Sequence, residues 1–154
     1  MFIGSHTCKL DDKGRVPFPA AFRAAAASSD GQVRLVVQRE PAVKYLTIMT
    51  KAVCEQEVEF FEKSLDPYDD EQRQLIDDLF QNMDSIDLDA AGRVQLPKRF
   101  VEKAGISKEV TFVGVGNKVK LWDKATYDKS AISDDEAAAL RRKYLRRKEK
   151  SLNN

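Results

Sequence analysis

Two arginines at matching positions of a repeated phrase are the residues best placed to do chemistry. Arg15 and Arg93 each end the sequence Asp-x-x-Gly-Arg, and the two copies lie 78 residues apart. An arginine that points outward can hold an anion, because its guanidinium group is always charged and carries a fork of N–H donors. The same group can instead pair with the nearby aspartate and brace the turn. The spacing slightly favours this pairing, and both roles remain open.

The repeated phrase predicts a tight turn between two short strands. Both copies read Leu-Asp-x-x-Gly-Arg-Val-x-φ-Pro-x-x-Phe, where φ is apolar, at residues 10–22 and 88–100. This match indicates an internal duplication of one structural unit. The aspartate can accept backbone N–H groups further along the chain, and the glycine allows a positive φ angle. Since apolar residues alternate with polar ones on both sides of the turn, each phrase is expected to form a β-hairpin.

A helix and a second pair of strands are expected after each phrase. Pro19 and Pro97 suit the first turn of a helix, where no N–H is needed. Phe22 and Phe100 are expected to face the core, and Gly105 suits the C-terminal end of the second helix. The strand-like runs that follow are residues 33–37 and 45–49 in copy one and residues 110–115 and 119–122 in copy two. Each unit is therefore expected to run β-hairpin, helix, β-hairpin, which gives an α+β fold.

Two helices are predicted between the units. Residues 51–65 place apolar side chains at helical spacing, and residues 69–71 (Asp-Asp-Glu) suit the start of a second helix because their carboxylates face the positive end of the helix dipole. The apolar faces either pack over the joined sheets or form a subunit interface. The expected divisions are residues 1–50 (first unit), 51–83 (connecting helices), 84–130 (second unit) and 131–154 (basic C-terminal helix and tail).

The C-terminal division combines an acidic start with a basic end. Ser133 is the expected N-cap of its helix, with Glu136 completing a capping box. Seven of the ten residues at 141–150 are cationic. The slightly favoured interpretation is a solvated helix whose charges suit its dipole, and the alternative is a tail that binds phosphates.

Composition argues against several classes of protein. The chain has 154 residues and a net charge of +1, so any contact with nucleic acid must use a local patch. Cys8 and Cys54 are too few for a disulfide framework and are expected to be reduced. No signal peptide or membrane-spanning run is visible, which predicts a soluble cytoplasmic protein without membrane contact.

Catalytic chemistry is poorly supported. His6 is the only histidine and is expected at the surface, so histidine-based metal sites and catalytic triads have no support. Phosphate-loop and dinucleotide glycine patterns are absent. We expect no catalytic residue, no metal site and no cofactor. A carboxylate site at Asp69 and Asp70 is the least favoured alternative.

The two phrases, the opening residues 1–4 (Met-Phe-Ile-Gly) and the stretch 112–123 resemble the MraZ family. The resemblance runs from residue 1 to about residue 127. MraZ proteins are bacterial regulators of the division and cell-wall gene cluster and belong to the AbrB-like swapped-hairpin superfamily. The resemblance implies that each half is one AbrB-like unit and that the two halves form a β-rich core with pseudo-two-fold symmetry.

The resemblance also implies a function. Family members are sequence-specific transcriptional regulators that bind double-stranded DNA at short direct repeats in their own promoter, associate with the nucleoid and assemble into homo-oligomeric rings. Carried over to this chain, the DNA-binding residues are Lys13, Arg15 and Arg93, and arginine's forked donors match guanine O6 and N7. Copy two has Ala91 in place of Lys13. The alternative is an AbrB-like interaction or antitoxin-type scaffold with only non-specific affinity for DNA.

Overall fold

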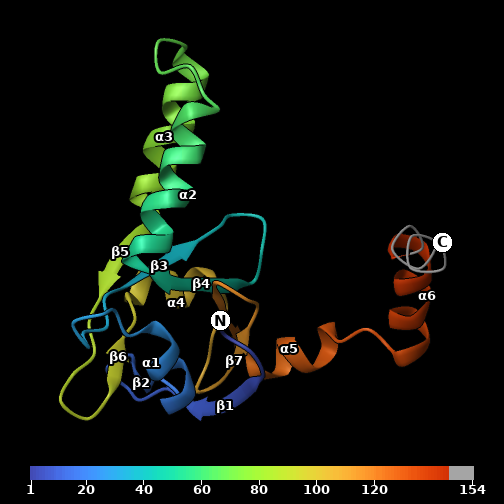
Figure 1. Cartoon of the computed structure of the whole chain (residues 1–154). Coiled ribbons are helices and arrows are strands. Elements are labelled where there is room, and N and C mark those ends of the chain that lie inside the picture. The colour runs from blue at the N-terminus through green and yellow to red at the C-terminus, as the bar shows by residue number, and fades with distance from the viewer. Residues whose placement is uncertain (146–154) are drawn as a thin grey trace.

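The computed structural model describes residues 1–145, which form an α+β fold with two antiparallel sheets (Figure 1). The strands are β1 (Ser5–Lys9), β2 (Arg15–Pro17), β3 (Leu35–Arg39), β4 (Tyr45–Thr50), β5 (Met83–Ile86), β6 (Arg93–Gln95), β7 (Glu109–Gly114) and β8 (Val119–Asp123). The helices are α1 (Ala20–Ala26), α2 (Lys51–Lys63), α3 (Asp70–Gln81), α4 (Lys98–Lys103), α5 (Lys124–Ser130) and α6 (Asp134–Tyr144). The α+β class predicted from the sequence is confirmed.

The sheets interleave strands from the two halves of the chain. The larger sheet has the order β1-β7-β8-β4-β3-β5, and the smaller one pairs β2 with β6. The first strand of copy one therefore lies on β7 of copy two, and β5 of copy two lies on β3 of copy one. In the smaller sheet Val16 lies opposite Val94, and these are the same position of the two copies.

The expectation that each phrase forms a hairpin of its own is wrong. β1 pairs with β7 rather than with β2, and β2 pairs with β6. A single bridge between Leu88 and Val94 joins the two sides of a turn. The alternation of apolar residues was interpreted correctly, since Val16 and Val94 are fully buried. Alternation fixes which face of a strand is buried but leaves its partner open, and here the partner comes from the other copy.

The other expected elements are present. The β3–β4 and β7–β8 pairs are antiparallel hairpins. Phe22 and Phe100 are each 1% exposed, so both helices face the core as predicted. Gly105 adopts a φ of 68° after Ala104, the C-cap of α4, and the N–H of Ile106 donates to the carbonyl of Val101. This geometry closes the helix end as a C′ glycine does.

One main hydrophobic core joins the two halves. Phe18, which follows β2, packs edge-on against Phe112 of β7, with ring centroids 5.8 Å apart. Phe22 packs in the same way against Phe2, at 5.5 Å. Phe18 and Phe112 come from different copies, so the two halves bury apolar surface against each other in one cluster.

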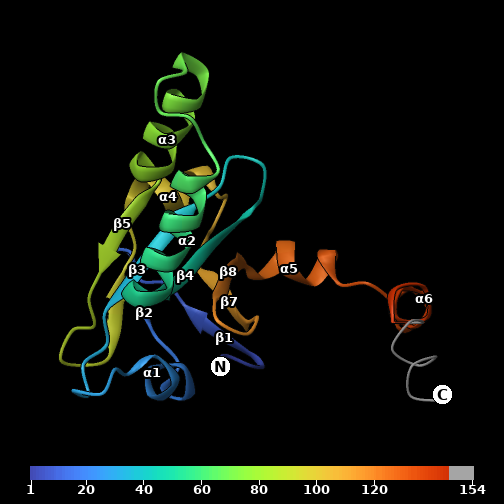
Figure 2. The same cartoon turned by 45° about the horizontal axis from the view of Figure 1, so that its top comes forward.

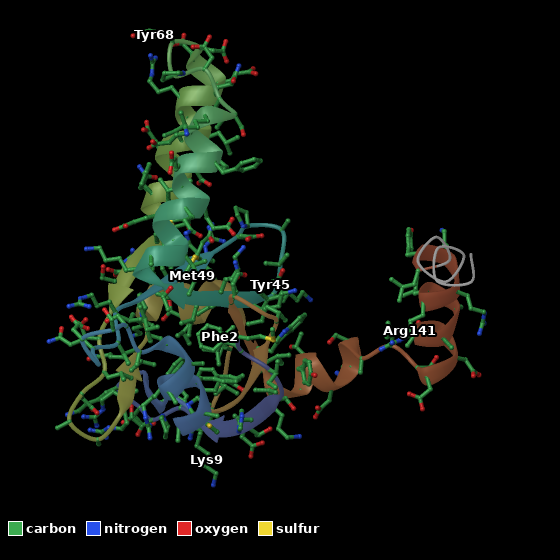
Figure 3. All side chains as sticks on the ribbon, viewed as in Figure 1. Phe2, Lys9, Tyr45, Met49, Tyr68 and Arg141 are labelled. Atoms are coloured by element: carbon green, nitrogen blue, oxygen red, sulfur yellow. The ribbon has the colours of Figure 1, made fainter. Side chains whose placement is uncertain are left out.

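The connecting helices form an antiparallel pair that projects from the large sheet (Figures 1 and 2). At its base Cys54 packs in a small buried cluster with Val36 and Met49 of the sheet. At its far end Tyr68 is 92% exposed and marks the tip in Figure 3. The predicted packing of the connecting helices over the sheet is therefore confirmed only for the base of the helix pair. Asp69 caps α3 by accepting from the N–H of Gln72, which confirms the predicted helix start.

The C-terminal elements extend away from the core. Helix α5 was not among the predicted elements, and Asp123 caps it at the end of β8. Ser133 caps α6 by accepting from the N–H of Glu136, as predicted. Helix α6 stands apart from both sheets (Figures 1 and 2). The expected basic run at residues 141–150 lies outside the described residues beyond position 145. Among the helices of residues 1–145, none has the length and apolar character that a membrane span requires.

Candidate nucleic-acid interface

The two phrases build nearly identical turns. We define turn one as residues 11–15 and turn two as residues 89–93. In turn one Asp11 Oδ1 accepts the N–H groups of Lys13 at 2.9 Å and Arg15 at 2.8 Å. In turn two Asp89 Oδ1 accepts those of the equivalent residues, each at 2.9 Å. The glycines at positions 14 and 92 have φ angles of 78° and 77°, which a side chain would resist.

Each arginine pairs with the aspartate of its own turn. Arg15 Nε donates to Asp11 Oδ2, and Arg93 Nε donates to Asp89 Oδ2, both at 2.8 Å. The backbone N–H of Arg15, followed by its side chain, lowers the pKa of Asp11, and Arg93 does the same for the pKa of Asp89. The bracing role that the spacing favoured is therefore confirmed.

The pairing leaves the outer end of each guanidinium group available. Only Nε of Arg15 and of Arg93 takes part in the pair, and in residues 1–145 no hydrogen bond engages their Nη groups. The two side chains remain 32% and 36% exposed. An arginine held through Nε keeps its two Nη groups as a fork, the geometry that suits phosphates and guanine edges.

Both arginines belong to the outer face of the small sheet. Arg15 lies opposite Gln95, and Arg93 lies opposite Pro17. Opposed residues of an antiparallel pair project to the same side, and neighbouring residues along a strand project to opposite sides. Because Val16 and Val94 are buried beneath the sheet, the two arginines share its other face.

Lys13 lies at the exposed tip of turn one. Its carbonyl accepts a hydrogen bond of 3.1 Å from Gln95 Nε2, which ties the turn to β6. The structure thus brings Lys13, Arg15 and Arg93, the three residues predicted as a site, to one small sheet and its turns.

Sequence reasoning missed a fourth cation, Arg23 of α1. Its Nη1 donates to the carbonyl of Phe18 at 2.7 Å and to that of Gly92 at 3.4 Å. A helix of copy one therefore supplies a guanidinium group to turn two, which lacks a lysine. The one available signal was the difference between copies, since Val101 stands at the position equivalent to Arg23.

The histidine and the two cysteines considered in the sequence analysis lie away from any candidate catalytic or metal site of the described residues. His6 is exposed, with its ring edge-on to Phe22 at 5.0 Å. Cys8 and Cys54 carry free thiols, and burial raises the pKa of each. Within the described part of the chain, no three His, Cys, Asp or Glu side chains gather closely enough to hold a metal ion.

Comparison with known proteins identifies the family. The model of the MraZ protein family, whose description compares it to antitoxins, matches residues 1–39 and 79–147. A protein of Anaeromyxobacter dehalogenans (strain 2CP-C) named transcriptional regulator MraZ is 32% identical over 134 residues, which cover 87% of this chain and 92% of the relative. The protein of the same name from Cytophaga hutchinsonii is 31% identical over 147 residues, 94% of each chain.

A third relative extends the match to almost the whole chain. Transcriptional regulator MraZ of Bacteroides fragilis (strain YCH46) is 26% identical over 153 residues, which cover 99% of this chain and 96% of the relative. The match assigns the chain to regulators and not to enzymes. On the shared sequence, carried by the two turns described above, the chain belongs to the MraZ family of transcriptional regulators.

Proposed function

We propose that the chain regulates transcription by binding short direct repeats of double-stranded DNA in the promoter of the division and cell-wall gene cluster. The observation that carries this proposal is the common outer face of Arg15 and Arg93, related by the paired Val16 and Val94 beneath them. Two equivalent guanidinium groups on one face suit two equivalent positions along a groove. The names of the relatives, all transcriptional regulators, agree with this role.

The two aspartate–arginine pairs preorganise the arginines for binding DNA. Asp11 and Asp89 hold Nε of each arginine, so less side-chain freedom is lost when DNA binds. The Nη fork of each arginine then reaches guanine O6 and N7 or a phosphate. Lys13 contributes a phosphate contact at turn one, and such contacts position the protein without reading sequence.

Several such faces would act together in a homo-oligomeric ring. A single chain presents one pair of turns, so its affinity is modest, and repeated sites bound by linked copies would add strength through avidity. The interleaved pairing of β1 with β7 and of β3 with β5 supports two AbrB-like swapped-hairpin units, at residues 1–50 and 84–130. We place the protein with the nucleoid in the cytoplasm.

The test is footprinting of the purified chain on the DNA upstream of its own gene, at increasing salt. We expect protection of evenly spaced short repeats. Arg15→Ala should weaken specific binding by about 1–3 kcal/mol, the value of a bidentate base contact. Arg15→Lys is the matched variant, because it keeps the charge and loses the fork. Unchanged binding of Arg15→Ala, with its circular dichroism intact, would rule out the assigned role.

A second candidate function is an interaction scaffold of the antitoxin type. Its specific support is the exposed apolar surface of the connecting helices, where Phe60 is 75% and Phe80 is 47% exposed. In that case DNA binding would ignore sequence and disappear at moderate salt. Phe60→Ser would then remove partner binding and leave the footprint unaltered.

A further inference from the structure

A cavity of about 860 Å³ opens beside turn one. Turn one, β5 and α4 form its walls, with Gly14, Ser85 and Val101 among the lining residues. Neither of the two arginines assigned to DNA lines it. Lys13 is the one residue assigned to DNA that lines it, so the roles proposed for Arg15 and Arg93 leave the cavity unused.

The internal repeat shows what fills the equivalent place at turn two. By the 78-residue offset, the segments equivalent to these walls are turn two, β1 and α1, and the side chain of Arg23 reaches from α1 to turn two. Its Nη1 donates to the carbonyls of Phe18 and Gly92. A Cβ built on Gly92 would lie only 2.5 Å from this Nη1. The fold therefore uses a guanidinium group to fill this position in one of its two copies.

At turn one the same carbonyl groups lack that donor. The residues equivalent to Phe18 and Gly92 are Leu96 and Gly14, and Val101 replaces Arg23 on the neighbouring helix. Valine carries no N–H on its side chain. Among residues 1–145, apart from the chain neighbours of Gly14, a Cβ built on this glycine would meet one heavy atom within 4 Å, the carbonyl oxygen of Leu96 at 3.2 Å. No side chain of residues 1–145 donates to this oxygen.

The charges that line the cavity also differ from those at turn two. Four of its carboxylates are on residues Asp12, Asp84, Asp87 and Glu102. The equivalent positions at turn two hold Ala90, His6, Lys9 and Ala24. Lys13 and Lys98 also line the cavity, and Arg99 makes a loose 3.9 Å contact with Asp84. Carboxylates outnumber cations on the walls, so the cavity suits a cationic group.

We propose that this cavity binds an arginine side chain from helix α6 of a second copy of the chain. The guanidinium group would donate to the carbonyls of Leu96 and Gly14, as Arg23 does to those of Phe18 and Gly92. Helix α6 is the source because it stands apart from its own sheets (Figure 1), and because Arg141, labelled in Figure 3, and Arg142 are both exposed. Its last turn is cationic and complements the carboxylates of the cavity. This inference is independent of DNA binding, and its tests use no DNA.

The first test asks whether the cavity takes a guanidinium group. The full chain is labelled with ¹⁵N-glycine, carries Arg141→Ala and Arg142→Ala so that no second copy fills the cavity, and is titrated with N-acetyl-arginine amide. We expect the resonance of Gly14 to shift and that of Gly92 to stay, because Arg23 already fills the second site. N-acetyl-lysine amide should bind more weakly, since it lacks the fork. Equal shifts at both glycines, or none at Gly14, would overturn the proposal.

A substitution provides the matched control. Val101→Arg should supply the missing group from the helix itself, abolish the Gly14 shift and preserve the melting temperature. Val101→Leu, introduced in the same way, should leave the titration as it is with valine at this position. A full Gly14 shift in a folded Val101→Arg variant would contradict the assigned site. If that variant does not fold, the comparison of Gly14 with Gly92 in the chain that carries only Arg141→Ala and Arg142→Ala still tests the site.

The second test identifies the source of the arginine by sedimentation of the full chain. Arg141→Ala combined with Arg142→Ala should weaken self-association roughly tenfold, the value of a charged hydrogen bond. Adding Val101→Arg should weaken it no further, because both changes remove one contact. Lys44→Ala with Lys129→Ala removes the same charge elsewhere and should have little effect. Equal effects of the two double variants, or none, would overturn α6 as the source.

Discussion

Arg23 Nη1 lies 3.4 Å from the carbonyl oxygen of Gly92, a residue 69 positions further along the chain. The contact links a helix of copy one to the turn of copy two. It exists because each phrase is paired across the molecule and not within its own copy. The two halves of the candidate DNA-binding face thus depend on each other for their shape.

Gly92→Ala and Gly14→Ala are both expected to destabilise the chain, and only the effect of Gly92→Ala should depend on Arg23. Both replacements force a side chain into positive φ, which costs about 1–2 kcal/mol. At Gly92 the new Cβ would also lie 2.5 Å from Arg23 Nη1 and displace it. In an Arg23→Ala background this extra cost should vanish, which urea denaturation of the four variants of the cycle would show. Strictly additive effects would contradict the contact.

The two aspartate–arginine pairs should give a pH-dependent contribution to the stability of the fold. The pKa values of Asp11 and Asp89 are lowered in the folded chain, so folding favours their ionised forms. Their contribution is complete above the ordinary carboxyl pKa of about 4 and is lost as pH falls through the lowered values. The melting temperature of Asp11→Asn with Asp89→Asn should lie below that of the unaltered chain at pH 7, and the gap should close in strong acid. A gap that widens in acid would refute this assignment.

Lys13 should affect the salt dependence of DNA binding more than its sequence preference. Lys13→Ala should weaken binding evenly across DNA sequences and reduce the salt slope by about 1, the value of one phosphate contact. Ala91→Lys places a lysine at the equivalent position of turn two and should increase the slope by a similar amount. Titrations of repeat-bearing and scrambled DNA at several salt concentrations would measure both. Lys129→Ala serves as the control on a distant helix.

The interleaved core predicts one cooperative unfolding transition. Phe22→Ala and Phe100→Ala each empty a site that is 1% exposed, and each should cost about 3–5 kcal/mol. Because the two phenylalanines serve the same core, either change should lower a single transition seen both by circular dichroism and by the fluorescence of Trp122. If instead a variant showed two transitions, one lowered and one unchanged, the halves would fold independently.

Local features of the fold were predictable from the sequence because they depend on neighbouring residues. The turn chemistry of Asp11 and Gly14, the caps provided by Asp69 and Ser133, and the helix end at Gly105 all arise from short-range hydrogen bonds and allowed φ angles. The alternation around Val16 indicated the buried face of its strand. The repeated phrase also carried the resemblance to the MraZ family.

The tertiary structure alone decided which strands are partners and which side chains meet. The pairing of β2 with β6 places Arg15 and Arg93 on one face, and no local pattern distinguishes this from two separate hairpins. The reach of Arg23 to Gly92 and the open cavity beside Val101 have the same origin, since both depend on segments far apart in sequence. Short-range preferences shape each segment, whereas burial of a shared core selects how the segments combine.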